Sequence, residues 1–299
     1  MFSKKSKSTD NKYDNKYGNK YGNKNKRKYS NISLTKSLED NISLLENIFS
    51  GDEMLITRRF QNKHLSEAKC CILYFEGMVN NEVLNENIIM PVLSNNLAEE
   101  INSKNLLEEL QYKVIASNDV KISDDLDKIN YSVTSGDTIF LLEGYDKAMI
   151  INTKGWKSRS ISEPESARVV RGPREGFTES ININLSLIRR KINNPDLKFK
   201  FNELGERTRT KICVCYIEGL ALESIINELE RRLDKMEIDA ILDSGYIQEY
   251  IRDEPFSPFE TIGASERPDV IAAKLLEGFR ILTTDRSICC ICIGCLYIY

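Results

Sequence analysis

The order of apolar and polar residues along the first half of the chain predicts a mixture of helices and strands. Apolar residues recur every three or four positions between Leu38 and Ile48, so a helix is expected over 38–49. Two apolar runs follow, from Met54 to Phe60 and from Cys70 to Phe75, and are predicted to be strands. The same criteria predict a helix over 83–89 that Pro91 interrupts, helical structure over 97–110, an extended segment over 114–120, a short helix over 124–129, and a hairpin of strands 137–142 and 148–153 around Gly144.

The pattern begins again after a stretch that is rich in serine. Residues 154–166 contain four serines together with Gly155 and Pro164, a composition that favours a connector. Beyond it, a helix is expected from the spacing of Ile181, Leu185 and Ile188, with Thr178 as its predicted N-cap. The second half is further predicted to contain strands over 197–201 and 210–216, and helices over 222–233, 245–251 and 269–276.

One short pattern occurs in both halves. The segments Cys70 to Met78 and Ile212 to Leu220 each consist of an apolar strand, a tyrosine, an apolar residue, a Glu-Gly pair and another apolar residue. The two copies lie 142 positions apart, and each leads into a predicted helix. We therefore expect an α/β (α+β) protein with two related mixed α/β subdomains, each a small sheet with flanking helices.

Charge divides the chain into a basic tail and an acidic body. Residues 1–29 carry ten Lys and Arg against two Asp, whereas the remainder carries 32 basic and 43 acidic residues. The first segment has no aliphatic residue after Met1, so it is expected to be disordered, with weak affinity for anionic lipid. The predicted organisation is a disordered basic Asn/Lys/Tyr-rich tail at 1–30, a first subdomain at 31–153, a linker at 154–166, a second subdomain at 167–283 and an aberrant Cys-rich apolar tail at 284–299.

Several classes of protein lack support in the sequence. No run of about 18–20 apolar residues is present, so no membrane-spanning helix is predicted. His64 is the only histidine, which removes multi-histidine metal sites and weakens any Ser-His or Cys-His nucleophile. The eight cysteines lie in apolar runs, which favours buried thiols in a reducing compartment. With no P-loop and no G-x-G-x-x-G motif, we expect no cofactor, no metal and no enzymatic activity.

Arginines gather around one rigid turn at the start of the second half. Gly172 and Pro173 lie between Arg171 and Arg174, and the proline fixes one backbone angle. Guanidinium groups held in this way suit a carboxylate, a phosphate or the acidic edge of a partner; the alternative is that they pair with nearby glutamates and pin the turn. The candidate ligand- or partner-binding residues are Arg168, Arg171, Gly172, Pro173, Arg174, Glu175, Arg189, Arg190, Glu266 and Arg267.

Six short segments, in a fixed order, point to a known family. They are Arg171-Gly172-Pro173-Arg174-Glu175-Gly176-Phe177-Thr178-Glu179, Tyr216-Ile217-Glu218-Gly219, Asp243-Ser244-Gly245-Tyr246-Ile247, Ser257-Pro258-Phe259, Glu266-Arg267-Pro268-Asp269 and Leu275-Leu276-Glu277-Gly278. In this order they resemble the A subunits of spore germination receptors, the GerA family, across about Glu53 to Gly278. Members of that family have a soluble N-terminal region followed by a multi-pass membrane region, and the resemblance implies that this chain contains only the first. Residues after Gly278 depart from the family pattern, which we interpret as a frameshift or truncation.

The resemblance implies a non-enzymatic sensing and signalling module of a nutrient germinant receptor, which couples germinant recognition in a membrane complex to spore germination. The implied partners are other germination receptor subunits, further copies of the chain and the membrane, reached through the missing region, with a nutrient germinant as a candidate ligand. The implied location is the spore inner membrane, with this soluble region facing the cytoplasm. Two alternatives stay open. One is an enzyme that binds an anionic metabolite through Arg171 and Arg174; the other, less expected, is nucleic-acid binding by residues 1–29.

Overall fold

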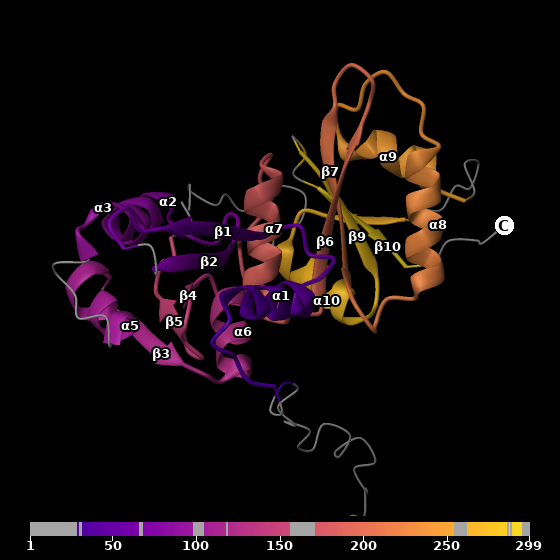
Figure 1. Cartoon of the computed structure of the whole chain (residues 1–299). Helices are drawn as coiled ribbons and strands as arrows, with labels where there is room; N and C mark the ends of the chain where they lie inside the picture. The colour runs from indigo at the N-terminus through magenta and orange to yellow at the C-terminus, as the bar shows by residue number, and fades with distance from the viewer. Residues whose placement is uncertain are drawn as a thin grey trace, which may run out of the picture.

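Two antiparallel sheets of five strands, each with helices on both faces, form the body of the protein (Figure 1). The computed structural model describes residues 29, 32–65, 68–97, 105–117, 119–155, 171–253, 262–285, 287 and 289–294. We call residues 32–155 the first half and residues 171–294 the second half. Each half contains one sheet, which confirms the predicted class of two mixed α/β subdomains. Apart from Tyr29, the predicted basic tail lies outside the described residues, as does the linker beyond Gly155.

In the first half the strands lie in the order β1-β2-β4-β5-β3, and all neighbours are antiparallel. The strands are β1 (Leu55–Gln61), β2 (Lys69–Phe75), β3 (Val120–Ser123), β4 (Thr138–Leu142) and β5 (Ala148–Ile151). The helices are α1 (Leu38–Ile48), α2 (Asn81–Leu84), α3 (Met90–Ser94), α5 (Leu106–Glu109) and α6 (Leu126–Thr134), with π-helical turns η1 (Asn85–Ile89) and η3 (Leu110–Val114). The predicted first helix, first two strands and hairpin are therefore confirmed.

Two local predictions in this half are wrong. Pro91 does not interrupt its helix, which continues to Ser94. The preceding turn is the wider η1, and Pro91 falls in the first turn of α3, a position that tolerates a missing backbone N–H. The helix predicted to end at Leu110 continues to Val114, the first residue of the predicted extended segment, because Leu110 and Val114 are four positions apart and both pack into the core.

The second half has the same strand order, β6-β7-β9-β10-β8, again antiparallel throughout. Its strands are β6 (Leu197–Leu204), β7 (Thr210–Ile217), β8 (Gly263–Ser265), β9 (Arg280–Thr284) and β10 (Cys290–Ile293). Its helices are α7 (Ile181–Lys191), α8 (Glu223–Asp234), α9 (Ser244–Ile251) and α10 (Pro268–Leu276). Each strand of one half thus has a counterpart in the other at the same place in the sheet.

Each half also opens with the same hydrogen-bonded loop ahead of its first helix. The backbone N–H of Thr35 donates to Asn41 Oδ1 over 2.7 Å, and Asn41 Nδ2 donates to the carbonyl of Thr35 over 2.7 Å. Thr178 and Asn184 form the same two bonds, over 2.7 and 2.6 Å. The predicted N-cap is therefore wrong: α7 begins after Ser180, and Thr178 holds the loop before it. This loop is evidence for the repeat that is independent of the strand pattern.

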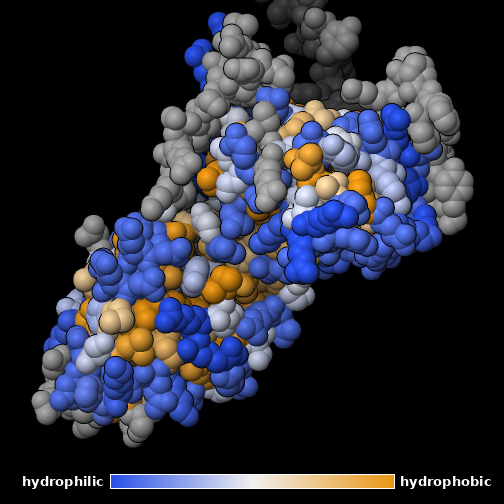
Figure 2. Space-filling view, turned by 90° about the horizontal axis from the view of Figure 1, so that it is seen from above, coloured by the Kyte–Doolittle hydropathy of each residue, from blue (hydrophilic) through white to orange (hydrophobic). Residues whose placement is uncertain are grey.

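A shared hydrophobic cluster joins the two halves. It contains side chains of α1 and α6 from the first half and of α7 and α10 from the second. These four helices lie between the two sheets (Figure 1). On β2, Cys71 and Leu73 face this cluster, whereas Cys70 and Ile72 face an outer cluster covered by α2, α3 and α5. The outer face of the second sheet packs in the same way against α8 and α9. The layers therefore run helices, sheet, helices, sheet, helices, and Figure 2 shows the two halves as two lobes.

Strand β10 corrects the prediction of an aberrant tail over 284–299. Cys290–Ile293 pair with β9 on one side and with β8 on the other, so the strand lies inside the second sheet. All four residues are buried: Cys290 and Cys292 face the shared cluster, and Ile291 and Ile293 face the outer one. The apolar composition that suggested a tail is that of a strand covered on both faces.

A chain that ends at Thr284 is expected to lose the fold of its second half. Removal of β10 leaves β8 and β9 without their common partner and uncovers apolar side chains, each worth about 1.5–3 kcal/mol when buried. A chain that ends at Gly294 keeps β10 and is the matched control. Thermal melting followed by circular dichroism compares the two, and equal midpoints would show that β10 is dispensable.

Candidate functional site

The predicted arginine turn lies at the surface, on the segment that enters the second half. Arg171, Gly172, Pro173 and Arg174 are all exposed. Gly172 has φ +124° and open space where a side chain would begin, so glycine is required there by the backbone and not by packing. Arg168 lies outside the described residues. The described part of the turn is accessible to a ligand or a partner.

The residue that follows the turn is bound to the end of α7. Glu175 Oε1 lies 3.5 Å from Arg190 Nη1, and Glu175 Oε2 lies 3.3 Å from Lys191 Nζ. All three side chains are partly buried. For Glu175 and Arg190 the structure therefore agrees with the alternative in which charged residues pin the turn, and these contacts hold it in place.

The turn also meets the second predicted segment, Glu266 and Arg267. The backbone N–H of Phe177 donates to the carbonyl of Glu266 over 2.9 Å, and the Phe177 side chain is buried in the shared cluster. Arg267 Nε donates to Asp269 Oδ1 over 3.1 Å, across the start of α10. Two stretches about 90 residues apart in the sequence thus form one surface region, fixed from beneath by a buried phenylalanine.

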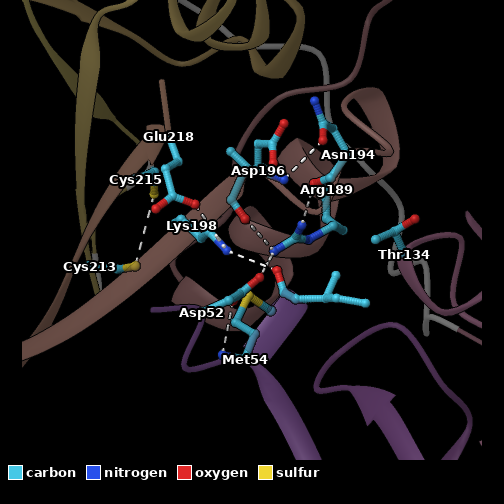
Figure 3. A network of polar contacts seen from close by, with 12 residues as sticks. Asp52, Met54, Thr134, Arg189, Asn194, Asp196, Lys198, Cys213, Cys215 and Glu218 are labelled. Atoms are coloured by element: carbon cyan, nitrogen blue, oxygen red, sulfur yellow. Dashed lines mark hydrogen bonds and ion pairs between the residues drawn. The ribbon is translucent and has the colours of Figure 1, made fainter. Parts of the chain in front are cut away.

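Arg189 is not a surface residue, which corrects its assignment to the candidate site. Its side chain has no exposed area, and it forms an ion pair with Asp52 of the first half, whose carboxylate is equally buried (Figure 3). The guanidinium also donates to the carbonyls of Asn194 and Leu197, over 3.2 and 3.3 Å. A ligand in solvent has no access to this arginine, and its role is to join the halves.

Aromatic rings from both halves enclose the same guanidinium. Its central carbon lies 4.4 Å from the centre of the Phe75 ring on β2 and 4.6 Å from that of Phe199 on β6. Ring faces attract a cation held at this distance. Burial raises the pKa of Asp52 and lowers the pKa of Arg189, and each charge opposes the shift of the other. The stability of each buried charge therefore depends on the presence of its partner.

A second buried cation lies at the same junction. Lys198 Nζ lies 3.4 Å from the carbonyl oxygen of Ile48, at the end of α1, and 3.6 Å from a carboxylate oxygen of Glu218 (Figure 3). The Lys198 side chain is 2% exposed, and its burial lowers the pKa of the amine. Contacts from β6 to the first half are thus electrostatic as well as apolar.

Sequence reasoning misses this junction, although one signal points to it. Arg189 follows Leu185 by four positions, so both lie on the buried face of α7. A cation on a buried face requires an acid nearby in space, yet Asp52 lies 137 positions earlier in the chain. The helical phase of Arg189 is visible in the sequence, whereas its partner is visible only in the fold.

Neither a metal centre nor a membrane-spanning helix is found in the described ranges. No group of three or more His, Cys, Asp or Glu residues in them is placed to hold a metal ion. No helix in the same ranges is both long and apolar enough to cross a bilayer. The described cysteines are free thiols, and all of them except Cys289 are buried.

Comparison with protein families gives a match over most of the chain. The family model described as "Bacillus/Clostridium GerA spore germination protein" matches residues 43–298. The match extends past Gly278, which corrects the expected end of the resemblance. Spore germination protein KA of Bacillus subtilis (strain 168) is 36% identical over 285 residues, which cover 95% of this chain and 52% of that protein. Spore germination protein B1 of the same organism is 34% identical over 253 residues, 83% of this chain and 50% of that protein.

A solved structure has a similar fold. The crystal structure of the N-terminal domain of the A subunit of the Bacillus megaterium spore germinant receptor GerK3 superposes with a TM-score of 0.68 and 27% sequence identity. The superposition covers 89% of this chain and 98% of that domain. The chain spans about half the length of the curated relatives it matches, and nearly all of this solved domain.

Replacement of Asp52 by alanine is expected to lower the free energy of unfolding by about 3–5 kcal/mol, because Arg189 is left as a buried charge without its partner. The double variant D52A/R189M removes both charges and is expected to recover most of that loss. Urea unfolding of the single and double variants gives the coupling energy directly. Arg171→Ala, an exposed arginine, is the matched control and is expected to stay within about 0.5 kcal/mol of the parent. A D52A variant as stable as this control would contradict the assigned role.

Proposed function

The chain belongs to the GerA family of spore germination proteins, and on that basis we propose that it is a sensing and signalling module of a nutrient germinant receptor. In this role it has no chemistry of its own and couples germinant recognition in a membrane complex to germination. The relatives named above support a role in spore germination. The similarity to the N-terminal domain of a germinant receptor A subunit supports a place within a receptor.

The junction between the halves is the observation that most directly supports a signalling role. The two halves share one hydrophobic cluster, and the Asp52–Arg189 pair crosses from one to the other between the rings of Phe75 and Phe199. A displacement of one half is therefore passed to the other through packed side chains. A relay depends on such close packing, whereas an enzyme depends on a cleft that holds acids, bases or a cofactor.

We assign contact with a partner or ligand to the exposed turn that carries Arg171 and Arg174. Glu175 is fixed to α7 and Phe177 to Glu266, so the turn stands on a rigid base. Guanidinium groups presented from a rigid base suit a carboxylate or a phosphate. The proposed partners are other receptor subunits and further copies of this chain, and the nutrient germinant is a candidate ligand.

We further propose that the module acts at the spore inner membrane and faces the cytoplasm. The chain spans about half of its relatives, and the family resemblance assigns a multi-pass membrane region to the part that it does not span. Movement within the module would then reach the membrane through that region or through another subunit.

An enzyme that binds an anionic metabolite at the same turn is the alternative. Its base would be Glu175 or Glu179. Both oxygens of Glu175 contact cations of α7, an arrangement that directs this carboxylate toward the protein and not toward a substrate. Glu179 is exposed, and no described contact orients it. The geometry therefore favours the partner contact over catalysis.

Replacement of Arg171 and Arg174 by lysine is expected to reduce the nutrient response of spores without affecting the fold. An ammonium group keeps the charge but cannot reproduce the two parallel N–H bonds of a guanidinium. Because both side chains are exposed, the free energy of unfolding of the purified chain should change by no more than about 0.5 kcal/mol. The paired measurement is a melting curve of the purified double variant and the nutrient-induced germination of spores whose full-length receptor carries the same changes.

Arg207→Lys is the matched control, because Arg207 is an exposed arginine on the β6–β7 hairpin whose side chain is 82% exposed. A stable double variant with an unchanged nutrient response would exclude the turn as a contact surface. A double variant that loses stability by more than about 1 kcal/mol would instead show that the arginines act within the fold. Turnover of an acid or phosphate metabolite by the purified chain, lost in the double variant, would favour the enzymatic alternative.

A further inference from the structure

Each half contains a corner at which the end of a strand meets the end of a helix. The first corner comprises residues 76–80 and 134–136, and the second corner comprises residues 218–222 and 276–278. Gly77 and Gly219 have φ of +76° and +79°, and Gly136 and Gly278 have φ of +93° and +88°. A side chain at Gly136 or at Gly278 would begin 3.0 Å from a carbonyl oxygen of the same corner. The two corners therefore have the same backbone geometry.

Helix α7 covers the first corner. A side chain at Gly77 would begin 3.2 Å from the carbonyl oxygen of Asn182, in the first turn of α7. Asn182 Nδ2 donates to Glu76 Oε1 over 3.3 Å. Met78 and Thr134, on either side of the glycines, have no exposed surface. The absence of a Cβ at Gly77 thus allows a helix to pack directly on this corner.

Among the described residues, none covers the second corner as α7 covers the first. No described atom lies within 4 Å of the place where a side chain at Gly219 would begin. Leu220 and Leu276, the counterparts of Met78 and Thr134, are 53% and 60% exposed, and Leu222 beside them is 64% exposed. Arg280 Nη2 donates to the carbonyl of Leu222, and Gly278, two residues after Leu276, packs on the carbonyl of Leu220, so the three leucines come from backbone segments that meet at this corner. Three exposed leucines on a rigid corner form an apolar patch of the kind that marks an interaction surface.

We propose that the second corner binds an amphipathic helix from the half of the family's polypeptide that this chain does not span. The helix lies on Gly219 as α7 lies on Gly77, and its apolar side covers Leu220, Leu222 and Leu276. This inference concerns a surface remote in sequence from the arginine turn and does not depend on the proposed sensing role.

The first corner supplies the precedent for this occupant. There, the covering helix comes from the same polypeptide and follows the sheet that it covers: β5 ends at Ile151 and α7 begins at Ile181. The relatives are about twice as long as this chain, so the polypeptide needed for a second covering helix exists in the family. A helix in the same polypeptide also binds at a high effective concentration, which allows a small patch to suffice.

The charges around the second corner determine which residues the proposed docking helix carries beside its apolar side. The carboxylates of Glu218 and Glu277 border the leucines and are 64% and 55% exposed. Lys198 and Lys274 each contact one of them from within the chain and leave the outer side of the carboxylates open. The apolar stripe of the helix is therefore bordered by lysine or arginine, which meet these carboxylates at the rim.

A second copy of the chain is a poorer occupant. In the repeat α1 corresponds to α7, so α1 of a second copy would be the helix to dock. Its exposed side carries Glu39 and Asp40, which would approach Glu218 and Glu277. Like charges placed together in this way oppose association.

The test uses the purified chain and synthetic peptides that tile the unmatched half of spore germination protein KA of Bacillus subtilis. Peptides of about 20–25 residues are long enough to form a helix on the surface, and fluorescence anisotropy in a neutral detergent measures their binding. We expect a peptide with an apolar stripe bordered by basic residues to bind. The variant L222E/L276E should weaken that binding by at least about tenfold, because it introduces two charges into the apolar contact.

Leu242→Glu is the matched control. Leu242 is 57% exposed, and it follows Ile241, which bonds to Thr210 at the opposite end of β7 from the second corner. This variant should leave peptide affinity within about twofold of the parent, and melting curves should match for all three proteins, since every substituted leucine is exposed. No binding by any peptide, or binding that L222E/L276E leaves unchanged, would overturn the proposal. A parent chain that sediments as a dimer while L222E/L276E sediments as a monomer would overturn it in favour of a second copy.

Discussion

The buried pair of Asp52 and Arg189 is the constraint on which the arrangement of the two halves depends. Taking two charges out of water costs several kcal/mol for each ion, and this cost is offset only where geometry and hydrogen bonding are good. Here the pair crosses the junction, and the carbonyls of Asn194 and Leu197 accept further N–H groups of the guanidinium. A shift of one half against the other would separate the charges in an apolar environment. The shared hydrophobic cluster holds the two halves together, and the ion pair fixes one alignment of the halves among those that apolar packing alone would allow.

The fold is predictable from the sequence wherever a local pattern determines the geometry. The apolar runs of β2 and β7, each closed by a Glu-Gly pair, identify both strands and the repeat. The strand β10 is missed because all four of its residues are apolar, and without alternation a covered strand resembles an unstructured apolar tail. The continuation of the helix through Pro91 is missed because a π-helical turn has no recognised signature in a single sequence.

The contacts of the charged side chains in the candidate site are predictable only where the two partners are close in the sequence. The Gly-Pro turn places Arg171 and Arg174 at the surface, and Glu175 pairs with cations 15 and 16 positions later. Arg189 resembles these residues in sequence, yet it points inward because of its helical phase and is satisfied by an acid 137 positions away. Arg189 and Arg190 are neighbours on α7, yet the first pairs with buried Asp52 and the second with Glu175 beside the turn. Only the tertiary structure distinguishes these two roles.

The separation of Asp52 from Arg189 also has a consequence for the order of assembly during synthesis. A nascent chain that has emerged from the ribosome as far as Ile151 has all five strands of the first sheet, but the counter-charge of Asp52 has not yet been made. Its carboxylate stays hydrated, and the side chains of α1 and α6 that later belong to the shared cluster stay open to water. Closure of the shared core waits for the arrival of α7. The first half is therefore complete in secondary structure before it is complete in packing, and this interval is when the nascent protein is most exposed to chaperones and to aggregation.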